Sequence, residues 1–138
     1  MNGRLEQVAP LVLVIDEQQQ DLNQVAAILA SANIACQCCT RPDEAFALAL
    51  RNPPDLILCD TNLFGESGPE TCERIKRQPG LEEVPVMFLS NAQIPDVIRR
   101  GHGANGAYCL RKPFAAEVLV GLIDAAITAR PVVAADAS

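Results

Sequence analysis

Four kinds of polar side chain in this sequence have the types needed for phosphoryl chemistry. The pair Asp16-Glu17 and the single Asp60 supply carboxylates, Ser90 supplies a hydroxyl, and Lys112 supplies an ammonium. Clustered carboxylates repel one another unless a cation lies among them, and oxygen ligands of this kind suit Mg²⁺. Such a cation would also neutralise an incoming phosphoryl group, so that a carboxylate can attack phosphorus. The hydroxyl and the ammonium can then bind the oxygens of an acyl phosphate. If these residues lie together, they predict a phosphorylation switch.

Each of these residues lies at the end of an apolar segment or just after one, and these segments have the composition of buried strands. The predicted strands cover residues 11–15, 34–39, 56–59, 84–89 and 107–110. Between them, apolar residues recur at helical spacing. The predicted helices cover residues 22–29, 45–50, 67–78, 95–100 and 115–129. Thr40 with Asp43 and Ser67 with Glu70 have the spacing of helix-capping pairs.

This alternation predicts an α/β fold, a five-stranded parallel sheet with helices on both faces in a flavodoxin-like, doubly wound (βα)5 arrangement. The carboxyl ends of parallel strands share one edge of the sheet, where ligands bind. The polar residues named above should therefore converge there. We expect one domain at residues 10–129, with a lead-in at 1–9 and a flexible tail at 130–138.

Composition excludes several functions. The 138 residues carry a net charge of −6, which argues against a general nucleic-acid binder because phosphate contacts need basic residues. No apolar run reaches the roughly 20 residues of a membrane helix. Met1–Pro10 lacks a signal-peptide segment, so we expect a cytoplasmic protein. We expect the six cysteines to be reduced structural thiols and the single His102 to be an exposed loop residue, which leaves a zinc site poorly supported.

In order and spacing, Asp16-Glu17, Asp60, Ser90 and Lys112-Pro113-Phe114 resemble the receiver domain of bacterial two-component response regulators. Asp60 and Ser90 are 90 − 60 = 30 residues apart, and Ser90 and Lys112 are 112 − 90 = 22 apart. The resemblance runs from about residue 11 to residue 127. It implies that Asp60 is the phosphoacceptor, that Ser90 follows the phosphoryl group, and that Lys112 pairs with it.

The resemblance also implies a metal site. Asp16, Glu17 and Asp60 would hold Mg²⁺ together with the backbone carbonyl of Asn62. It further implies a cis Lys112–Pro113 bond. Gly68 matches the family's glycine after the phosphorylation loop, where a residue without Cβ can take a positive φ.

The implied phosphodonor is a sensor histidine kinase or a histidine phosphotransfer protein. The implied output is a downstream protein target, or a homodimer, bound through the face made by helix 4, strand 5 and helix 5. Arg99, Arg100 and Arg111 should gather near that face and could dock an acidic partner or a second protomer. The domain would then be a switch rather than an enzyme, catalysing only its own phosphoryl transfer and dephosphorylation.

Some positions depart from the family pattern. Glu17 stands where aspartate is commoner, Phe64 where proline is usual, and Asn91 where a small alanine is favoured. Receivers usually carry an aromatic residue three positions before the lysine. That position is Cys109 here, and Tyr108 precedes it. Either a bulge in the last strand moves Tyr108 into the slot, or the aromatic gate is absent, and we favour its absence.

Three other functions are alternatives to this one. An aspartate-nucleophile phosphatase of the haloacid dehalogenase type needs a second acid two residues after its nucleophile, and Asn62 cannot transfer protons. A flavodoxin-like flavin binder needs a first loop that cradles phosphate, and Asp16-Glu17 would repel one. The third alternative is a degenerate receiver that acts as a phosphorylation-independent interaction scaffold.

Overall fold

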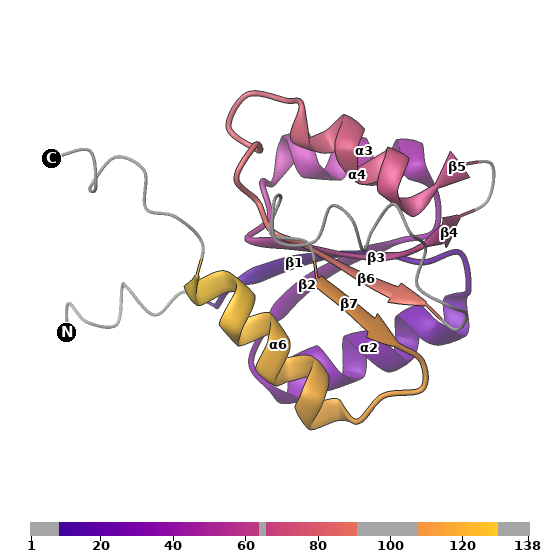
Figure 1. Ribbon diagram of the computed structural model, residues 1–138, viewed down its shortest axis with the longest axis vertical. Coiled ribbons are helices and arrows are strands. Elements are labelled where there is room, and N and C mark those ends of the chain that lie inside the picture. The colour runs from indigo at the N-terminus through magenta and orange to yellow at the C-terminus, as the bar shows by residue number, and fades with distance from the viewer. Residues whose placement is uncertain (1–8, 64–65, 91–107, 130–138) are drawn as a thin grey trace, which may run out of the picture.

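A single five-stranded parallel sheet forms the centre of the protein (Figure 1). The computed structural model describes residues 9–63, 66–90 and 108–129. The strand order across the sheet is β2–β1–β3–β6–β7, so the chain starts near the middle, moves to one edge and then crosses to the other. The strands are β1 (Leu11–Ile15), β2 (Ala35–Cys39), β3 (Leu56–Asp60), β6 (Val86–Ser90) and β7 (Tyr108–Arg111).

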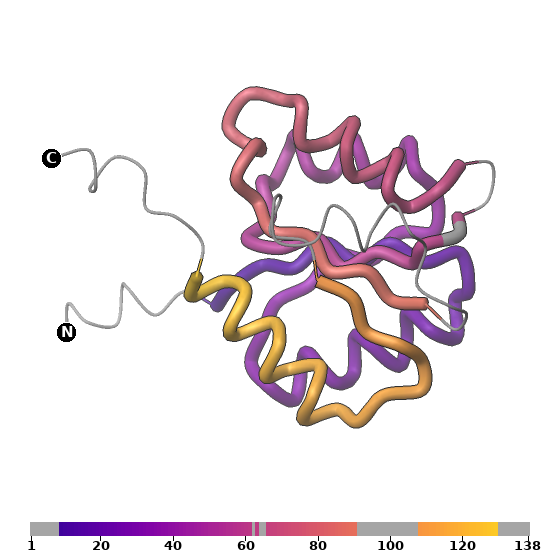
Figure 2. Tube along the Cα trace, viewed as in Figure 1, coloured from indigo at the N-terminus to yellow at the C-terminus, as the bar shows by residue number. Residues whose placement is uncertain are grey.

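Helices cover both faces of this sheet, as the paths of the chain in Figures 1 and 2 show. On one face lie α2 (Gln19–Ser31) and α6 (Ala116–Thr128). On the other face lie α3 (Pro42–Arg51) and α4 (Gly68–Lys76). The expected fold class, a flavodoxin-like doubly wound parallel sheet, is confirmed.

The alternation of side chains along the central strands explains why two layers of helices are needed. In β1, Val12 and Val14 pack into the apolar cluster beneath α2 and α6. Leu13 and Ile15 pack into a separate cluster beneath α3 and α4. Successive side chains of a strand point to opposite faces, so a strand that is apolar throughout is stable only when both faces are covered.

Of the two helix caps predicted from the sequence, the structure contains one. Ser67 is the N-cap of α4, and its Oγ accepts a hydrogen bond of 3.2 Å from the backbone N–H of Glu70, as predicted. The predicted cap at Thr40 is wrong. The N-cap of α3 is Arg41, which makes no side-chain cap, and Pro42 opens the helix instead.

A short hairpin between β3 and α4 was not anticipated. Its strands, β4 (Asn62–Leu63) and β5 (Glu66–Ser67), pair antiparallel, with Asn62 opposite Ser67. Two-residue strands carry no periodicity that a sequence can reveal. The hairpin connects the end of β3 to the start of α4.

The six cysteines are free thiols, as expected. Only three of them act as buried apolar residues, however: Cys39, Cys59 and Cys72. Cys36 and Cys38 lie on the edge strand β2, where Cys38 is exposed and the two Sγ atoms are 3.9 Å apart.

Several expectations fall outside the described part of the chain. These are the helix at 95–100, the tail at 130–138, most of the lead-in, and the residues Phe64, Asn91, Arg99, Arg100 and His102. Within the described part, none of the helices has the length and apolar character needed to cross a bilayer.

Candidate functional site

Side chains from the ends of three strands converge on one ammonium group. Asp16 follows β1, Asp60 ends β3, and Lys112 follows β7. The Nζ of Lys112 donates to Asp16 Oδ2 at 2.9 Å and to Asp60 Oδ2 at 3.4 Å. The structure therefore brings together three of the residues that the sequence placed at this edge.

Asp16 is the most deeply buried member of the group, with 2% of its surface exposed. Burial raises the pKa of its carboxyl, and the nearby charge of Asp60 adds to the rise. Two hydrogen bonds oppose it, since Oδ1 accepts from the backbone N–H of Gln18 at 2.9 Å and Oδ2 accepts from Lys112. Asp16 is therefore a buried acid whose negative charge needs a nearby cation.

Lys112 supplies that cation in the described structure. Burial by itself would lower the pKa of its ammonium, but the hydrogen bonds that the ammonium donates to Asp16 and Asp21 outweigh burial, and the pKa is raised. The Lys112 side chain is 13% exposed, and the Lys112–Pro113 bond is cis, as expected. Lys112 thus stays charged within a partly buried acidic group.

Asp21 is a member of this group that the sequence analysis missed. It lies in the first turn of α2, and its Oδ2 accepts from Lys112 Nζ at 2.9 Å. The available signal was an acidic residue at the start of the helix that follows β1, because that helix begins at the same edge of the sheet. The apolar spacing of this stretch by itself indicates a helix and gives no role to Asp21. The three carboxylates and one ammonium give a formal charge of −3 + 1 = −2.

Ser90 lies at the same edge, on the strand beside β3. It ends β6, is 1% exposed, and follows Leu89, which pairs with Asp60. Its carbonyl oxygen accepts a 2.7 Å hydrogen bond from the backbone N–H of Lys112. The position of the lysine backbone is therefore tied to the end of β6.

The predicted metal ligands are only partly assembled by side chains. Asp16 and Asp60 already share one cation, Lys112, and their oxygens are the hard ligands that Mg²⁺ prefers. Glu17 is exposed, and its side chain takes no part in the hydrogen bonds of Lys112. Among the described residues, no group of three or more His, Cys, Asp or Glu side chains forms a metal site. Two carboxylates nevertheless fit Mg²⁺, which commonly keeps several waters and uses one or two protein carboxylates.

Gly68 fixes the backbone beside Asp60, although not in the way that we expected. Its φ angle is not positive. Among the described glycines, a positive φ is found at Gly80 instead. Instead, a Cβ at position 68 would overlap the carbonyl oxygen of Asp60, and the Gly68 N–H donates to Thr61 O at 2.8 Å. Glycine is needed here because two backbone segments approach closely.

The last strand has a regular register around the predicted gate position. Met87 to Ser90 pair one to one with Tyr108 to Arg111, without a bulge. Tyr108 packs against the apolar cluster beneath α2 and α6, whereas Cys109 packs on the opposite face, against the cluster beneath α3 and α4. The two residues therefore face opposite sides of the sheet, and Tyr108 does not occupy the Cys109 position.

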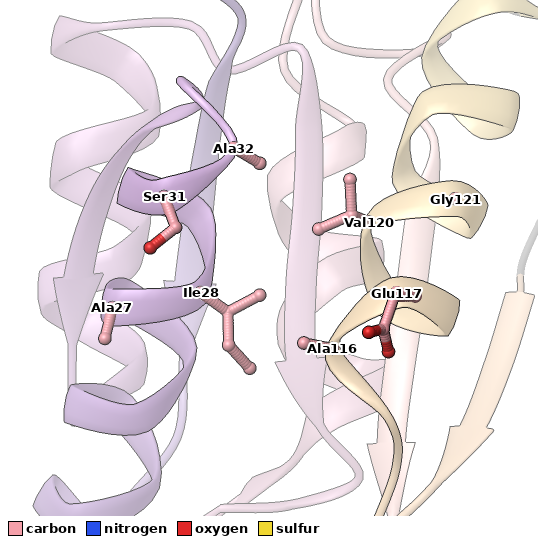
Figure 3. A pocket seen from close by; sticks show the side chains of 8 residues that line it. All are labelled: Ala27, Ile28, Ser31, Ala32, Ala116, Glu117, Val120 and Gly121. Atoms are coloured by element: carbon pink, nitrogen blue, oxygen red, sulfur yellow. The ribbon is translucent and has the colours of Figure 1, made fainter.

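A cavity lies between α2 and α6, and it shares no residue with this acidic group (Figure 3). Its volume is about 590 Å³, and Ile28 and Val120 project into it from the two helices. Its lining is mainly apolar and lacks convergent polar groups, so it offers no chemistry of its own.

Comparisons with known proteins assign the chain to a family without reference to the geometry of this site. The family model described as the response regulator receiver domain matches residues 12–124. The phosphate regulon transcriptional regulatory protein PhoB of Pseudomonas aeruginosa is 28% identical over 120 residues, which cover 87% of this chain and 52% of that protein. The DNA-binding dual master transcriptional regulator RpaA of Synechocystis is 30% identical over 117 residues, covering 84% and 48% respectively. The chain thus spans about half the length of these relatives.

Solved structures agree on the fold. The chemotaxis protein CheY4 of Vibrio cholerae is 25% identical, superposes with a TM-score of 0.78, and is matched over 86% of this chain and 98% of its own.

Proposed function

Because the chain belongs to the response regulator receiver domain family, we propose that it accepts a phosphoryl group on Asp60 and thereby switches a protein-interaction surface. One observation carries the assignment to Asp60. Its carboxylate ends the central strand β3, is 14% exposed, and shares the Lys112 ammonium with the buried Asp16. An acid that is partly exposed and has a cation beside it can receive phosphorus without leaving the added negative charge uncompensated.

The proposed transfer has simple chemistry. An oxygen of the Asp60 carboxylate forms a bond to phosphorus while the bond from phosphorus to a nitrogen of the donor breaks. The donor nitrogen keeps the electron pair and takes up a proton. Lys112 then donates to a phosphoryl oxygen, and the Ser90 hydroxyl binds another. Both residues are held at the correct edge by the backbone bond between Ser90 O and Lys112 N.

The proposed metal is Mg²⁺, the ion that receiver domains generally use. Asp16 and Asp60 would hold it with the backbone carbonyl of Asn62, the first residue of β4. We place Glu17 at the outer side of this site, where its exposure suits a contact through water. When bound, the ion neutralises the carboxylates and the transferring phosphoryl group.

The proposed partners follow from the family. The donor is a sensor histidine kinase or a histidine phosphotransfer protein, and the output is a protein target or a second copy. The output face would be the one made by the helix expected at 95–100, which lies outside the described residues, together with β7 and α6, and the exposed Arg111 ends β7. We propose that residues 10–129 are the receiver domain, that it works in the cytoplasm, and that it acts as a switch without an external substrate.

The test is phosphorylation by a small donor. The wild-type protein is incubated with Mg²⁺ and phosphoramidate or acetyl phosphate, and its intact mass is measured. We expect a gain of one phosphoryl group, no gain in Asp60→Asn, and a normal gain in Asp124→Asn. Asp124 is an exposed aspartate on α6, so it controls for the change of type and charge.

Two results would contradict the proposal. A mass gain that persists in Asp60→Asn would place the phosphoryl group elsewhere. No gain in the wild-type protein, with a folded far-UV spectrum, would favour the phosphorylation-independent scaffold.

A further inference from the structure

The Lys112 ammonium has a third partner that the receiver assignment does not use. An ammonium carries three N–H donors. In this protein Asp16, Asp21 and Asp60 lie at 2.9, 2.9 and 3.4 Å from Nζ. Two of these acids belong to strand ends, whereas Asp21 belongs to the first turn of α2. Asp21 is therefore bound as closely to the lysine as the buried Asp16 is.

We propose that Asp21 is a positioning residue, which keeps the Lys112 ammonium at the edge of the site when Asp16 and Asp60 bind Mg²⁺. This inference rests on the proposed function. Lys112 and the proposed metal ion would use the same two carboxylates, because the lysine donates to both Asp16 and Asp60. Two like-charged cations repel each other, so Lys112 must give way when the ion binds. Asp21 provides a negative charge toward which the ammonium can move.

The space around Asp21 permits this movement. A cavity of about 300 Å³ lies beside the pair and is lined by Asp21, Gln24, Val25, Lys112, Pro113 and Phe114. The Asp21 side chain is 34% exposed, whereas that of Asp16 is 3% exposed. A partly hydrated acid at the margin of a cavity can keep its ion pair while the lysine shifts.

Lys112 and Mg²⁺ therefore compete for the carboxylates of Asp16 and Asp60, and Asp21 favours binding of the metal ion. Without Asp21, the partners that remain to Lys112 are Asp16 and Asp60, and its ammonium stays on the metal's own ligands. The affinity for Mg²⁺ should then fall. A partly exposed ion pair of this kind corresponds to a loss of roughly fivefold.

The experiment measures Mg²⁺ affinity by isothermal titration calorimetry, with no phosphodonor present. We expect Asp21→Asn to bind Mg²⁺ roughly fivefold more weakly than the wild-type protein. Asp21→Glu, which keeps the charge, should recover most of the affinity, and Asp124→Asn should match the wild type. Unchanged affinity in Asp21→Asn would overturn the inference.

A double-variant cycle separates positioning from the general effect of removing a negative charge. In a Lys112→Met background there is no ammonium to reposition, so adding Asp21→Asn should change Mg²⁺ affinity by less than about twofold. An equal loss in both backgrounds would mean that Asp21 acts only by its charge, and the inference would fail. The ¹⁵N signal of the Lys112 ammonium should also shift or broaden in Asp21→Asn.

The outcome is distinguishable from failure of the proposed function. The same wild-type preparation is tested for phosphorylation of Asp60 by intact mass. If the wild type is phosphorylated and Asp21→Asn binds Mg²⁺ normally, the role of Asp21 is wrong while the switch stands. If the wild type is not phosphorylated, the proposed function itself fails.

Discussion

The ammonium of Lys112 lies closer to Asp16 than to Asp60, at 2.9 Å from one carboxylate and 3.4 Å from the other. The lysine thus compensates the buried acid first and the proposed phosphoacceptor second. Asp60 keeps a weaker hold on the cation and a more exposed carboxylate, two properties that suit a nucleophile. We expect a phosphoryl group on Asp60 to extend the negative charge and to draw Lys112 toward it.

The first prediction concerns the charge balance of Asp16. Replacing Lys112 with Met should lower the free energy of unfolding at pH 7 by roughly 3 kcal/mol, because a buried carboxylate loses its cation. The pKa of Asp16 should rise further, since burial remains while the lysine's opposing effect is lost. A raised native pKa means that the folded state binds the proton more readily. The stability deficit of the variant should therefore shrink as pH falls through that pKa.

Urea unfolding between pH 4 and pH 7 and ¹³C NMR of the Asp16 carboxyl measure these two effects. Asp16→Asn added to Lys112→Met provides the control, because it removes the uncompensated charge and should restore part of the stability. A deficit that is independent of pH would show that Lys112 stabilises the fold by packing alone.

The second prediction concerns the close approach of Gly68 to Asp60. Gly68→Ala should destabilise the protein by about 1–3 kcal/mol, because the added Cβ overlaps the Asp60 carbonyl oxygen. It should also slow phosphorylation, since the backbone of Asp60 must move. Gly121→Ala is a matched control. Gly121 lies in α6 with open space around it, so this change should stabilise by up to about 1 kcal/mol. Thermal unfolding measures the stability change in both variants. Equal changes in Gly68→Ala and Gly121→Ala would contradict the proposed overlap at position 68.

The third prediction is a loss of stability at alkaline pH. Burial raises the pKa of the Cys39 thiol to about 12, against an ordinary value of 9.0. Between these values the unfolded thiol ionises and the folded one does not. The thiol's contribution is therefore fully present below pH 9 and is lost as pH rises toward 12, by up to about 1.4 kcal/mol per pH unit.

The Cys39→Ala variant tests this contribution through the slope of stability against pH from 8 to 10. We expect a shallower slope than in the wild type, although Cys59, whose pKa burial also raises, should leave some dependence. The absolute stability will also fall because a cavity remains, so the slope is the diagnostic quantity. Identical slopes would exclude Cys39 as a source.

The fourth prediction concerns the gate. Tyr108 packs beneath α2 and α6, on the opposite face from Cys109. Phosphorylation should therefore change the surface around β7 without a swinging tyrosine, and Tyr108→Phe should leave these changes nearly intact. Backbone NMR shifts before and after phosphorylation measure them. Complete loss of the response in Tyr108→Phe would show that the hydroxyl is part of the switch.

Much of the fold was predictable because its signals are local. Continuous apolar segments identified β1 and β3, and a serine with a glutamate three residues later identified the start of α4. Strand and helix bounds shifted by one to three residues in places. For example, β6 begins at Val86 rather than Val84, and α2 begins at Gln19 rather than at Leu22. The cap at Thr40 failed because Pro42 sets the first turn without any side-chain acceptor.

The site was predictable in its strand-end residues and not in its helix residue. The topology places Asp16 and Asp60 at one edge whatever the packing details. For Asp21, the sequence can indicate the edge at which its helix begins, but its contact with Lys112 depends on how α2 lies on the sheet, which is a tertiary property. The role of Gly68 was misjudged for the same reason, since contact with the Asp60 carbonyl joins segments that the sequence does not place side by side.

The ion pair between Lys112 and Asp16 has a practical consequence for handling the protein. Because the lysine already compensates the charge of the buried acid, we expect the native fold not to depend on a bound divalent ion. Treatment with a chelator such as EDTA should halt phosphorylation yet leave the far-UV spectrum and melting temperature nearly unchanged. The apo form would then be a well-folded reagent, ready for metal to be titrated back.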